Sequence, residues 1–366
     1  MPRVSARLPD FPWDHLTEFA AIARAHPEGV VDLSIGTPVD PTPEIVQQAL
    51  RAAADSPGYP VTIGLEATRQ ACLDWLGRRA GAVQLGLDAV LPVIGSKELI
   101  ASLPLHLGIG PGDLVVHPAL AYPTYEVGTR LAGARPMATD SLIAIGPERP
   151  ALLWVNSPSN PTGRILPVEH LRKVVDWCRE RGTVLVSDEC YLEYAWEGRS
   201  ISVLHPDVCG GSAEGILAVH SLSKRSNLAG YRCGFVAGDA ALVGELVTVR
   251  KNLGLLMPGP QQHAMIAALD DDEHLADQHA RYAARRALLE EALLGAGFRV
   301  DHSEGSLYLW ATRDEGCWDT VAWCAQRGVL VAPGAFYGAA GACHIRVAFT
   351  ASDERVAAAL ARLAGR

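Results

Sequence analysis

The chain has 366 residues, of which 49% are hydrophobic and 20% are charged, and its formal net charge is −9. This is the composition of a globular protein, and the length is sufficient for two lobes. Because no run of lysine and arginine occurs, neither nucleic acid nor an anionic membrane surface is an expected partner. No apolar run reaches the roughly 18 residues of a membrane span, and the N-terminus has no apolar export signal.

The cysteines exclude two further classes of protein. They form no C-x-x-C pair and are scattered through the chain, so neither a zinc site nor a disulfide framework is expected. Reduced thiols and a cytoplasmic location fit this pattern. The eight cysteines are Cys72, Cys178, Cys190, Cys209, Cys233, Cys317, Cys324 and Cys343.

The first elements follow a proline-rich arm. The segment 30–54, "VVDLSIGTPVDPTPEIVQQALRAAA", predicts a short strand, a turn rich in glycine and proline, and an amphipathic helix. In that helix, we expect Ile45, Val46, Ala49 and Leu50 to share one buried face.

The middle of the chain alternates short apolar runs with helical patterns. A helix is predicted over 167–182, "PVEHLRKVVDWCRERG". Strands that alternate with helices indicate a mainly parallel, doubly wound α/β sheet. The "GIGPGD" segment lies before a run rather than after it, so we interpret it as a turn. The apolar runs are "AVLPV" (89–93), "LVVHP" (114–118), "ALLWVN" (151–156), "TVLVSDE" (183–189) and "GILAVHS" (215–221).

The pattern changes near residue 275. A long charged helix over 276–297 precedes strands in 298–312, a helix over 318–328, two more strands and a final helix. We therefore predict an arm and the start of a small domain in 1–35, a large domain in 36–274, and a smaller α+β domain in 275–366.

Polar side chains follow the predicted strands. Lys224 comes directly after the run 215–221, and Asp188 ends the run 183–189. Asn160 follows the run 151–156 in "NSPSNPTG", and the turn Gly95–Ser96–Lys97 opens a helix after the run 89–93. Ligands bind at the carboxyl ends of parallel strands, and a helix N-terminus suits a phosphate. Arg346, alternating with apolar neighbours in "CHIRVAF", needs a carboxylate or phosphate partner.

Taken in order, these motifs resemble those of class I/II aminotransferases, the fold-type-I family that depends on pyridoxal 5'-phosphate (PLP). The motifs are the Gly-Ser-Lys turn, "NPTG", Asp-x-x-Tyr, and Ser-x-x-Lys with Arg232 eight residues after the lysine, then "IRV". The resemblance covers nearly the whole chain. It implies a large domain with a mainly parallel seven-stranded sheet between helices, and a smaller α+β domain.

A narrower resemblance is to the actinobacterial N-succinyldiaminopimelate aminotransferases of lysine biosynthesis. It rests on "FPWD", "DLSIGTPVDP", "LPVIGSKELI", "NSPSNPTG", "SDECYLEY" and "HSLSK". It implies a ping-pong transfer between N-succinyl-LL-2,6-diaminopimelate and 2-oxoglutarate. The distal carboxylate of that donor needs a cation, and the candidates are Lys97, Arg225 and the pair Arg250–Lys251.

The resemblance also implies catalytic roles. Lys224 would hold PLP covalently and move a proton at the substrate Cα, while Asp188 would pair with the ring nitrogen. Tyr191 and Asn160 would hydrogen-bond the ring oxygen O3'. The residues expected at the phosphate are Gly95, Ser96, Lys97, Ser221 and Arg232.

Five further roles follow from the resemblance. Tyr122 would stack on the cofactor ring, and Tyr59 would reach the phosphate of a neighbouring subunit, which implies a homodimer with shared sites. Arg346, helped by the backbone at Gly36, would bind the substrate α-carboxylate, and Asn160 would line the substrate site as well. The arm around Phe11–Trp13 would cover the site.

Several alternatives stay open at this stage. An aminotransferase of the same fold with an aspartate, aromatic or specialised-metabolite donor shares these motifs, and so does a PLP-dependent carbon–sulfur β-lyase. The Ser-x-x-Lys motif also occurs in penicillin-recognising serine enzymes, but the chain lacks their K-T-G. A transcription regulator with this fold would need a DNA-binding domain, and only about 30 residues precede the first predicted strand.

Overall fold

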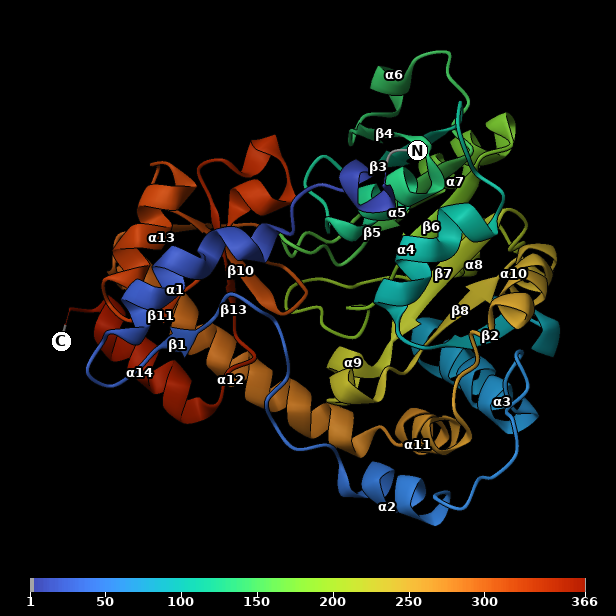
Figure 1. Cartoon of the computed structure of the whole chain (residues 1–366), viewed down its shortest axis with the longest axis horizontal. Helices are drawn as coiled ribbons and strands as arrows, with labels where there is room; N and C mark the ends of the chain where they lie inside the picture. The colour runs from blue at the N-terminus through green and yellow to red at the C-terminus, as the bar shows by residue number, and fades with distance from the viewer. Residues whose placement is uncertain (1–2, 366) are drawn as a thin grey trace.

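The computed structural model describes residues 3–365 and builds two regions, each around its own sheet (Figure 1). The α-helices are α1 (Thr17–Arg24), α2 (Glu44–Ala52), α3 (Glu66–Trp75), α4 (Ser96–His106), α5 (Thr124–Ala132), α6 (Leu142–Ile145), α7 (Val168–Arg181), α8 (Pro206–Cys209), α9 (Leu222–Arg225), α10 (Ala240–Leu253), α11 (Gly259–Asp270), α12 (Glu273–Gly295), α13 (Cys317–Ala325) and α14 (Asp353–Leu363). The strands are β1 (Val31–Asp32), β2 (Val90–Val93), β3 (Leu114–His117), β4 (Arg135–Ala138), β5 (Leu152–Asn156), β6 (Val184–Asp188), β7 (Ile216–Ser221), β8 (Gly234–Gly238), β9 (Arg299–Asp301), β10 (Tyr308–Thr312), β11 (Val329–Leu330), β12 (Ala332–Pro333) and β13 (Ile345–Ala348).

The larger sheet has seven strands in the order β2-β8-β7-β6-β5-β3-β4. β8 pairs antiparallel with β2 and β7, and the remaining pairs are parallel. All strands of this sheet except β8 therefore run in one direction, and their carboxyl ends meet at one edge. The amino end of β8 lies at the same edge. The prediction of a mainly parallel seven-stranded sheet is confirmed.

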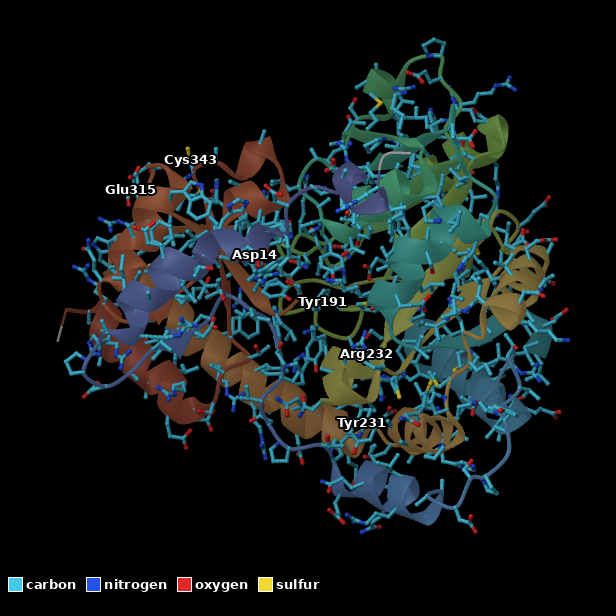
Figure 2. All side chains as sticks on the ribbon, in the orientation of Figure 1. Asp14, Tyr191, Tyr231, Arg232, Glu315 and Cys343 are labelled. Atoms are coloured by element: carbon cyan, nitrogen blue, oxygen red, sulfur yellow. The ribbon has the colours of Figure 1, made fainter. Side chains whose placement is uncertain are left out.

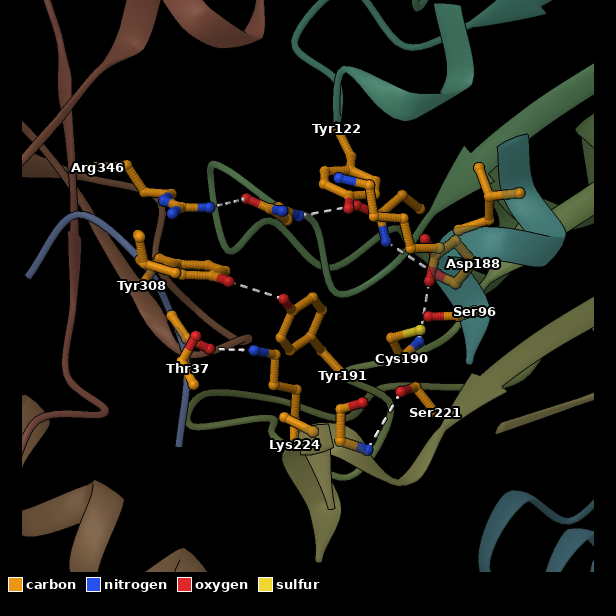
Figure 3. Close-up of a pocket in the computed structure, with 18 of the residues that line it drawn as sticks. Thr37, Ser96, Tyr122, Asp188, Cys190, Tyr191, Ser221, Lys224, Tyr308 and Arg346 are labelled. Atoms are coloured by element: carbon orange, nitrogen blue, oxygen red, sulfur yellow. Dashed lines mark hydrogen bonds between the residues drawn. The ribbon is translucent and has the colours of Figure 1, made fainter. Parts of the chain in front are cut away.

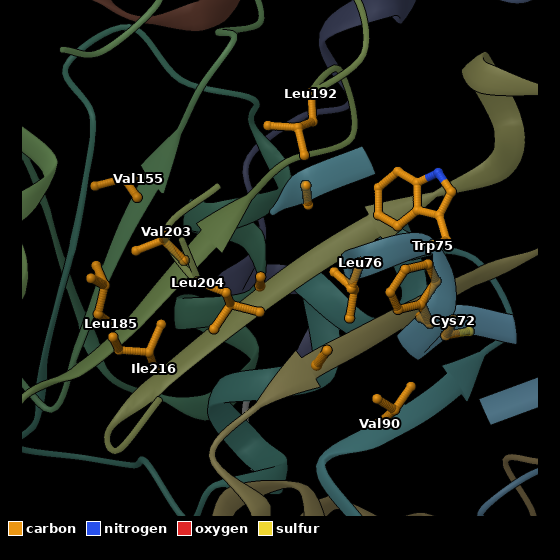
Figure 4. Close-up of a cluster of buried hydrophobic side chains, with 14 of the residues drawn as sticks. Cys72, Trp75, Leu76, Val90, Val155, Leu185, Leu192, Val203, Leu204 and Ile216 are labelled. Carbon is orange, nitrogen blue, oxygen red and sulfur yellow. The ribbon is translucent and has the colours of Figure 1, made fainter. Parts of the chain in front are cut away.

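Both faces of this sheet are buried under helices, which is why its strands are apolar runs. Along β7, Ile216 and Ala218 join the core beneath α3, α7 and α11 (Figure 4), whereas Leu217 and Val219 join the core beneath α4, α5 and α10. The same alternation turns Asp188 at the end of β6 toward α5, where Tyr125 contacts it.

The helix α7 shows how the pattern positions these layers. Leu171, Val174, Val175 and Cys178 recur at helical spacing and are all buried against the sheet. Full burial of each leucine or valine side chain contributes about 1.5–3 kcal/mol to the free energy of folding. Gly182, with φ of 66°, ends the helix in the left-handed conformation that favours glycine, so the predicted helix over 167–182 is confirmed.

The second region is built on a four-stranded antiparallel sheet in the order β12-β13-β10-β9. β1 pairs with β11, and α1 packs on α13, so residues 17–32 belong to this region in space. The helix α12 connects the two regions (Figure 1), and its buried Arg285 donates to Asp40 at 2.7 Å and to Asp353 at 2.6 Å. The domain boundary at residue 275 stays a prediction.

One expectation about the core is wrong. Ile45 is 47% exposed, while Val46 is buried and Leu50 is half-buried. The helix α2 packs on α11, and Ile45 lies about 100° away from the buried Val46 around the helix axis. Within residues 3–365, no helix is both long enough and apolar enough to cross a membrane.

Candidate active site

A cavity of about 380 Å³ opens between the two sheets, at the edge where the parallel strands end. Tyr191 and Arg232 mark its position between the two regions (Figure 2), and Figure 3 shows its walls. Most of the side chains predicted for the site meet in it. They are Ser96, Lys97, Tyr122, Asn160, Asp188, Tyr191, Ser221, Lys224, Arg232 and Arg346, together with Gly36.

Lys224 lies in the short helix α9 directly after β7. The hydroxyl of Ser221 caps that helix by accepting from the Ser223 amide at 3.2 Å, which fixes the direction in which the lysine leaves the strand. The Lys224 Nζ donates to the Gly36 carbonyl. Desolvation lowers the pKa of Lys224, and the cations Arg346 and Arg232 lower it further. Such a lysine gives up its proton readily and is suited to nucleophilic attack.

Asp188 is buried opposite the lysine, on the α5 side of the sheet. Its carboxylate accepts from the Tyr125 hydroxyl at 2.8 Å and from the Cys190 amide at 3.2 Å. Burial raises the pKa of Asp188, and these hydrogen bonds oppose the rise. Tyr125 in turn stacks on Trp154 with 4.8 Å between ring centroids, so the acid is held in a rigid wall.

One end of the cavity is built from Gly95, Ser96 and Arg232, which together form an anion cradle. Gly95 has φ of 89° and connects β2 to α4, whose first N–H groups face the cavity with the positive end of the helix dipole. A Cβ at Gly95 would collide with the guanidinium of Arg232. Arg232 itself has φ of 58° and precedes β8, so strand reversal brings it to this edge. Gly95, Ser96 and Arg232 thus meet at one end of the cavity, with donors that suit an anion.

Arg346 forms the opposite end of the cavity. It is buried on β13, where it donates to Asn160 Oδ1 at 2.8 Å and to the Ser34 carbonyl at 2.6 Å. The backbone N–H of Asn160 donates in turn to Asn156 Oδ1 at 2.8 Å. Nε of Arg346 is buried and finds no acceptor among residues 3–365. The guanidinium therefore has a free donor for a carboxylate.

Tyr308 on β10 is a site residue that the sequence analysis missed. Its hydroxyl lies 2.8 Å from that of Tyr191, and the Arg346 guanidinium lies 3.9 Å from its ring centroid. A Cβ at Gly36 would collide with it, which explains the glycine there. The available signal was the strand pairing: Tyr308 pairs with Ala348, two residues from Arg346, across neighbouring antiparallel strands.

The mouth of the cavity is aromatic. Phe11 and Trp13 of the N-terminal arm line it, with 5.6 Å between their ring centroids, as predicted for the arm. Trp13 also packs against Phe336 at 5.4 Å. The ammonium of Lys97 lies 5.5 Å from the Phe11 ring centroid, and Lys97 is itself exposed at the rim.

The structure removes two cations from the candidates for a distal carboxylate. Arg225 is buried away from the cavity, donates to Glu193 at 2.6 Å, and also contacts Asp272 and the Ala268 carbonyl. Arg250 is buried and makes a two-pronged ion pair with Glu98 at 3.0 and 2.8 Å. Because buried arginines must be neutralised by a partner, both are already committed.

Tyr59 also lies outside the cavity. Its side chain is 99% exposed on the segment between α2 and α3. A contact between Tyr59 and a neighbouring subunit's phosphate stays a prediction. The cations of the candidate set that face the cavity or solvent are Lys97 and Lys251, and Lys97 alone lines the cavity.

Comparison with known proteins gives this geometry a family. The sequence profile of "Aminotransferase class I and II" matches residues 28–363. The chain belongs to the class I and II aminotransferase family. It is 61% identical to "Probable aminotransferase Rv1178" of Mycobacterium tuberculosis over 98% of this chain and 86% of that protein. It is 58% identical to the "4-dedimethylamino-4-oxo-anhydrotetracycline transaminase OxyQ" of Streptomyces rimosus, covering 97% and 99%.

More distant members share the whole length. The "LL-diaminopimelate aminotransferase" of Dehalococcoides mccartyi is 34% identical over 98% of this chain and 96% of that protein. A crystal structure of an aminotransferase from Neisseria meningitidis superposes with a TM-score of 0.90 at 31% identity, covering 100% of this chain and 98% of that one. The fold-type-I architecture and the transaminase activity expected from the sequence are therefore confirmed.

Aminotransferases of this family depend on PLP, and the cavity fits that cofactor. PLP presents an aldehyde, a pyridine nitrogen and a phosphate, and the cavity holds a lysine with a lowered pKa, a buried carboxylate and an anion cradle. Tyr122 also lines the cavity and is half-buried. Burial raises the pKa of Tyr122 to about 12, so its phenol stays neutral beside the cofactor.

Proposed function

We propose that this aminotransferase exchanges the amino group of N-succinyl-LL-2,6-diaminopimelate with 2-oxoglutarate. The observation that carries the choice of donor is Lys97, an exposed ammonium at the rim of a cavity whose other end holds Arg346. A donor with two anionic ends can use both cations. More distant relatives are named as aminotransferases of LL-diaminopimelate, and this supports a long donor of this kind.

The bound cofactor supplies an electron sink, and the protein supplies the groups around it. In our proposal, Lys224 would hold PLP covalently and, once the substrate amine has replaced it there, would carry a proton between the substrate Cα and the cofactor. Its lowered pKa supports this role because such an amine loses its proton more readily than an ordinary lysine. Asp188 keeps the ring nitrogen protonated, and the hydrogen bonds from Tyr125 and Cys190 hold the carboxylate in place.

The remaining cofactor contacts are proposed from position. Ser221, Arg232 and the backbone N–H groups of the turn Gly95–Ser96–Lys97 bind the phosphate, which leaves the Lys97 ammonium for the distal carboxylate. Tyr191 and Asn160 hydrogen-bond O3', and Tyr122 stacks on the ring. Tyr191 already lies at 2.8 Å from Tyr308, and Asn160 at 2.8 Å from Arg346, so both are held at the wall of the cavity.

The substrate α-carboxylate is assigned to Arg346. Its buried Nε is without an acceptor among residues 3–365, and a planar guanidinium binds a carboxylate through two parallel hydrogen bonds. Gly36 assists through its backbone, because a side chain there would collide with Tyr308. The aromatic rings of Phe11 and Trp13 also line the cavity, and in our proposal they limit the access of water to it.

We also propose a homodimer with shared sites. Tyr59 is 99% exposed, and three other apolar side chains of residues 39–61 are exposed as well, namely Val39 (56%), Ile45 (47%) and Val61 (55%). In our proposal, a second copy of the chain covers them. Mixing Tyr59→Phe and Lys224→Ala proteins tests the sharing, because a heterodimer would contain one site with both native residues. If activity stays absent after proven subunit exchange, Tyr59 does not act across the interface.

A second substrate class, an amino acceptor rather than a donor, is favoured by the mouth of the cavity. Phe11, Trp13 and Tyr122 present aromatic faces that would also suit a polycyclic ketone, the kind of substrate named for the Streptomyces rimosus relative. No relative named above is a lyase or a regulator, so those alternatives are set aside.

A panel of donors with 2-oxoglutarate decides between the two classes. We expect kcat/KM for N-succinyl-LL-2,6-diaminopimelate to exceed the values for aspartate, alanine and aromatic amino acids by at least about tenfold, or about 1.4 kcal/mol of transition-state preference. If an aromatic amino acid or an amino-substituted polycycle exceeds it by tenfold, the proposed donor is wrong and the polycyclic class is favoured. Glutamate formation measures transfer in every case.

A further inference from the structure

Tyr308 lies where the two ends of the cavity meet, and no role follows for it from the family motifs. Its ring lies flat beneath Arg346, with 3.9 Å from the guanidinium carbon to the ring centroid. Its hydroxyl lies 2.8 Å from the hydroxyl of Tyr191, and the two rings meet edge to face (Figure 3). One side chain therefore contacts both the carboxylate-binding arginine and the phenol assigned to O3'.

We propose that Tyr308 is a positioning residue that connects substrate binding at Arg346 to the cofactor through the hydroxyl of Tyr191. The inference rests on the proposed roles of Arg346 and Tyr191. It adds a second connection between the two ends of the cavity, separate from the hydrogen bond between Arg346 and Asn160.

The direction of the hydrogen bonds follows from counting protons. A phenol has one hydrogen to donate. When Tyr191 donates to O3', it has none left for Tyr308, so Tyr308 must donate to the Tyr191 oxygen. A hydrogen bond received at that oxygen polarises the Tyr191 hydroxyl and strengthens its own donation to O3'.

The surroundings of Tyr308 favour this donation. Burial opposes ionisation of the phenol, but nearby positive charge, chiefly the guanidinium of Arg346 at 3.9 Å from the ring centroid, acts in the other direction, and the pKa of Tyr308 is lowered. A more acidic phenol is a stronger hydrogen-bond donor. The titratable groups that interact with Tyr308 come from six elements or loops, and they are Arg346, Lys224, Tyr191, Cys190, Tyr337, Tyr122 and Tyr282.

The inference predicts the pH titration of the cofactor's visible absorption in the holoenzyme. A strong hydrogen bond from Tyr191 favours the anionic O3' and the unprotonated nitrogen at Lys224, so it keeps the midpoint of this titration low. Tyr191→Phe should raise the midpoint by about one unit, and Tyr308→Phe should raise it by about a third of that. When Tyr191→Phe is already present, adding Tyr308→Phe should not raise the midpoint any further.

Tyr337→Phe is the matched control. Tyr337 is also a buried tyrosine beside Arg346, at 5.0 Å, but its hydroxyl has no hydrogen-bond partner among residues 3–365. Its replacement should leave the midpoint unchanged. All these variants keep an aromatic ring in the core, and an unchanged thermal midpoint with full cofactor loading verifies the fold.

Succinate tests the connection to Arg346, because it is a carboxylate that cannot be transaminated. Bound succinate neutralises the guanidinium, weakens Tyr308 as a donor and should raise the midpoint. The rise should be smaller in Tyr308→Phe than in the wild type. An equal rise in both proteins, or a Tyr308→Phe midpoint equal to that of wild type, overturns the inference. If Tyr191→Phe itself leaves the midpoint unchanged, the failure lies in the proposed role of Tyr191 instead.

Discussion

The two ends of the cavity are built in different ways. The cofactor end takes Lys224, Asp188 and the Gly95 turn from the carboxyl ends of β7, β6 and β2, at one edge of a mainly parallel sheet. The substrate end combines the N-terminal arm with strands near the C-terminus, so Phe11 and Arg346 line one cavity although 335 residues separate them. The cofactor end is thus set by the sheet itself. The substrate end depends on how two regions of the chain pack together.

This difference predicts how substitutions behave. Changes at the cofactor end should lower turnover for every donor alike, because the same chemistry serves all of them. Changes at the substrate end should alter the relative kcat/KM of different donors, and the changes in rate should be smaller than those at the cofactor end. Four substitutions, from the largest expected effect to the smallest, test that division.

Lys224→Ala should have the largest effect. It removes both the covalent attachment and the group that moves the proton, and general acid–base catalysis contributes about 10²–10⁴-fold. We expect the single-turnover rate to fall by at least about 10³-fold with every donor, while PLP still binds. Borohydride reduction of the wild type followed by peptide mapping should place the pyridoxyl group on Lys224. A label on any other lysine contradicts the assignment.

Asp188→Asn should come next. The amide cannot hold the ring nitrogen in its protonated form, so the electron sink is weakened. We expect kcat to fall by about 10²-fold or more for all donors in equal proportion, with the fold kept because Tyr125 can still hydrogen-bond the side chain. Stopped-flow kinetics with two unlike donors measures this. Near-normal turnover, or a loss confined to one donor, would mean that Asp188 serves binding instead.

Arg346→Lys tests the boundary between the two ends. A lysine keeps the charge but loses the two-pronged contact with the carboxylate. We expect KM for every carboxylate donor to rise by about tenfold to 100-fold, with a smaller change in kcat. Amines that lack a carboxylate are the control, and their slow reaction should be unaffected. If those amines are impaired equally, the arginine acts on the cofactor rather than on the carboxylate.

Lys97→Met should have the smallest and most selective effect. It should lower kcat/KM about tenfold for donors with a distal carboxylate, or about 1.4 kcal/mol, and leave alanine nearly unchanged. Lys251→Met, at an exposed position near the end of α10, is the matched control. An equal loss for alanine would assign Lys97 to the phosphate. No loss with any donor would leave the distal carboxylate without its proposed cation.

The cofactor end was predictable from the sequence because each of its groups directly follows an apolar run. Once the runs at 183–189 and 215–221 are recognised as neighbouring parallel strands, Asp188 and Lys224 must lie at one edge. Two strands of the same sheet escaped prediction. β4 is an edge strand with Pro136 and no buried residue, and β8 is a short run bounded by Gly234 and Gly238.

The substrate end was predictable only in part, because it depends on long-range packing. Nothing local in "RKNLG" indicates that Arg250 is buried against Glu98, 152 residues earlier. Tyr308 and Tyr125 look like ordinary core aromatics in the sequence, and only the structure reveals the partners of their hydroxyls. Side chains that act through a distant partner have no spacing that the sequence can reveal.

The reversed direction of β8 has a consequence for folding. Lys224 and Arg232 are eight residues apart and belong to the connection between the antiparallel strands β7 and β8, so a local hairpin is enough to bring them together. Arg346 must instead close a loop of more than 100 residues to reach the same cavity. Local contacts form faster than distant ones, since less chain entropy is lost in closing them. We therefore expect a refolding chain to bring Lys224 and Arg232 together well before Arg346 joins them.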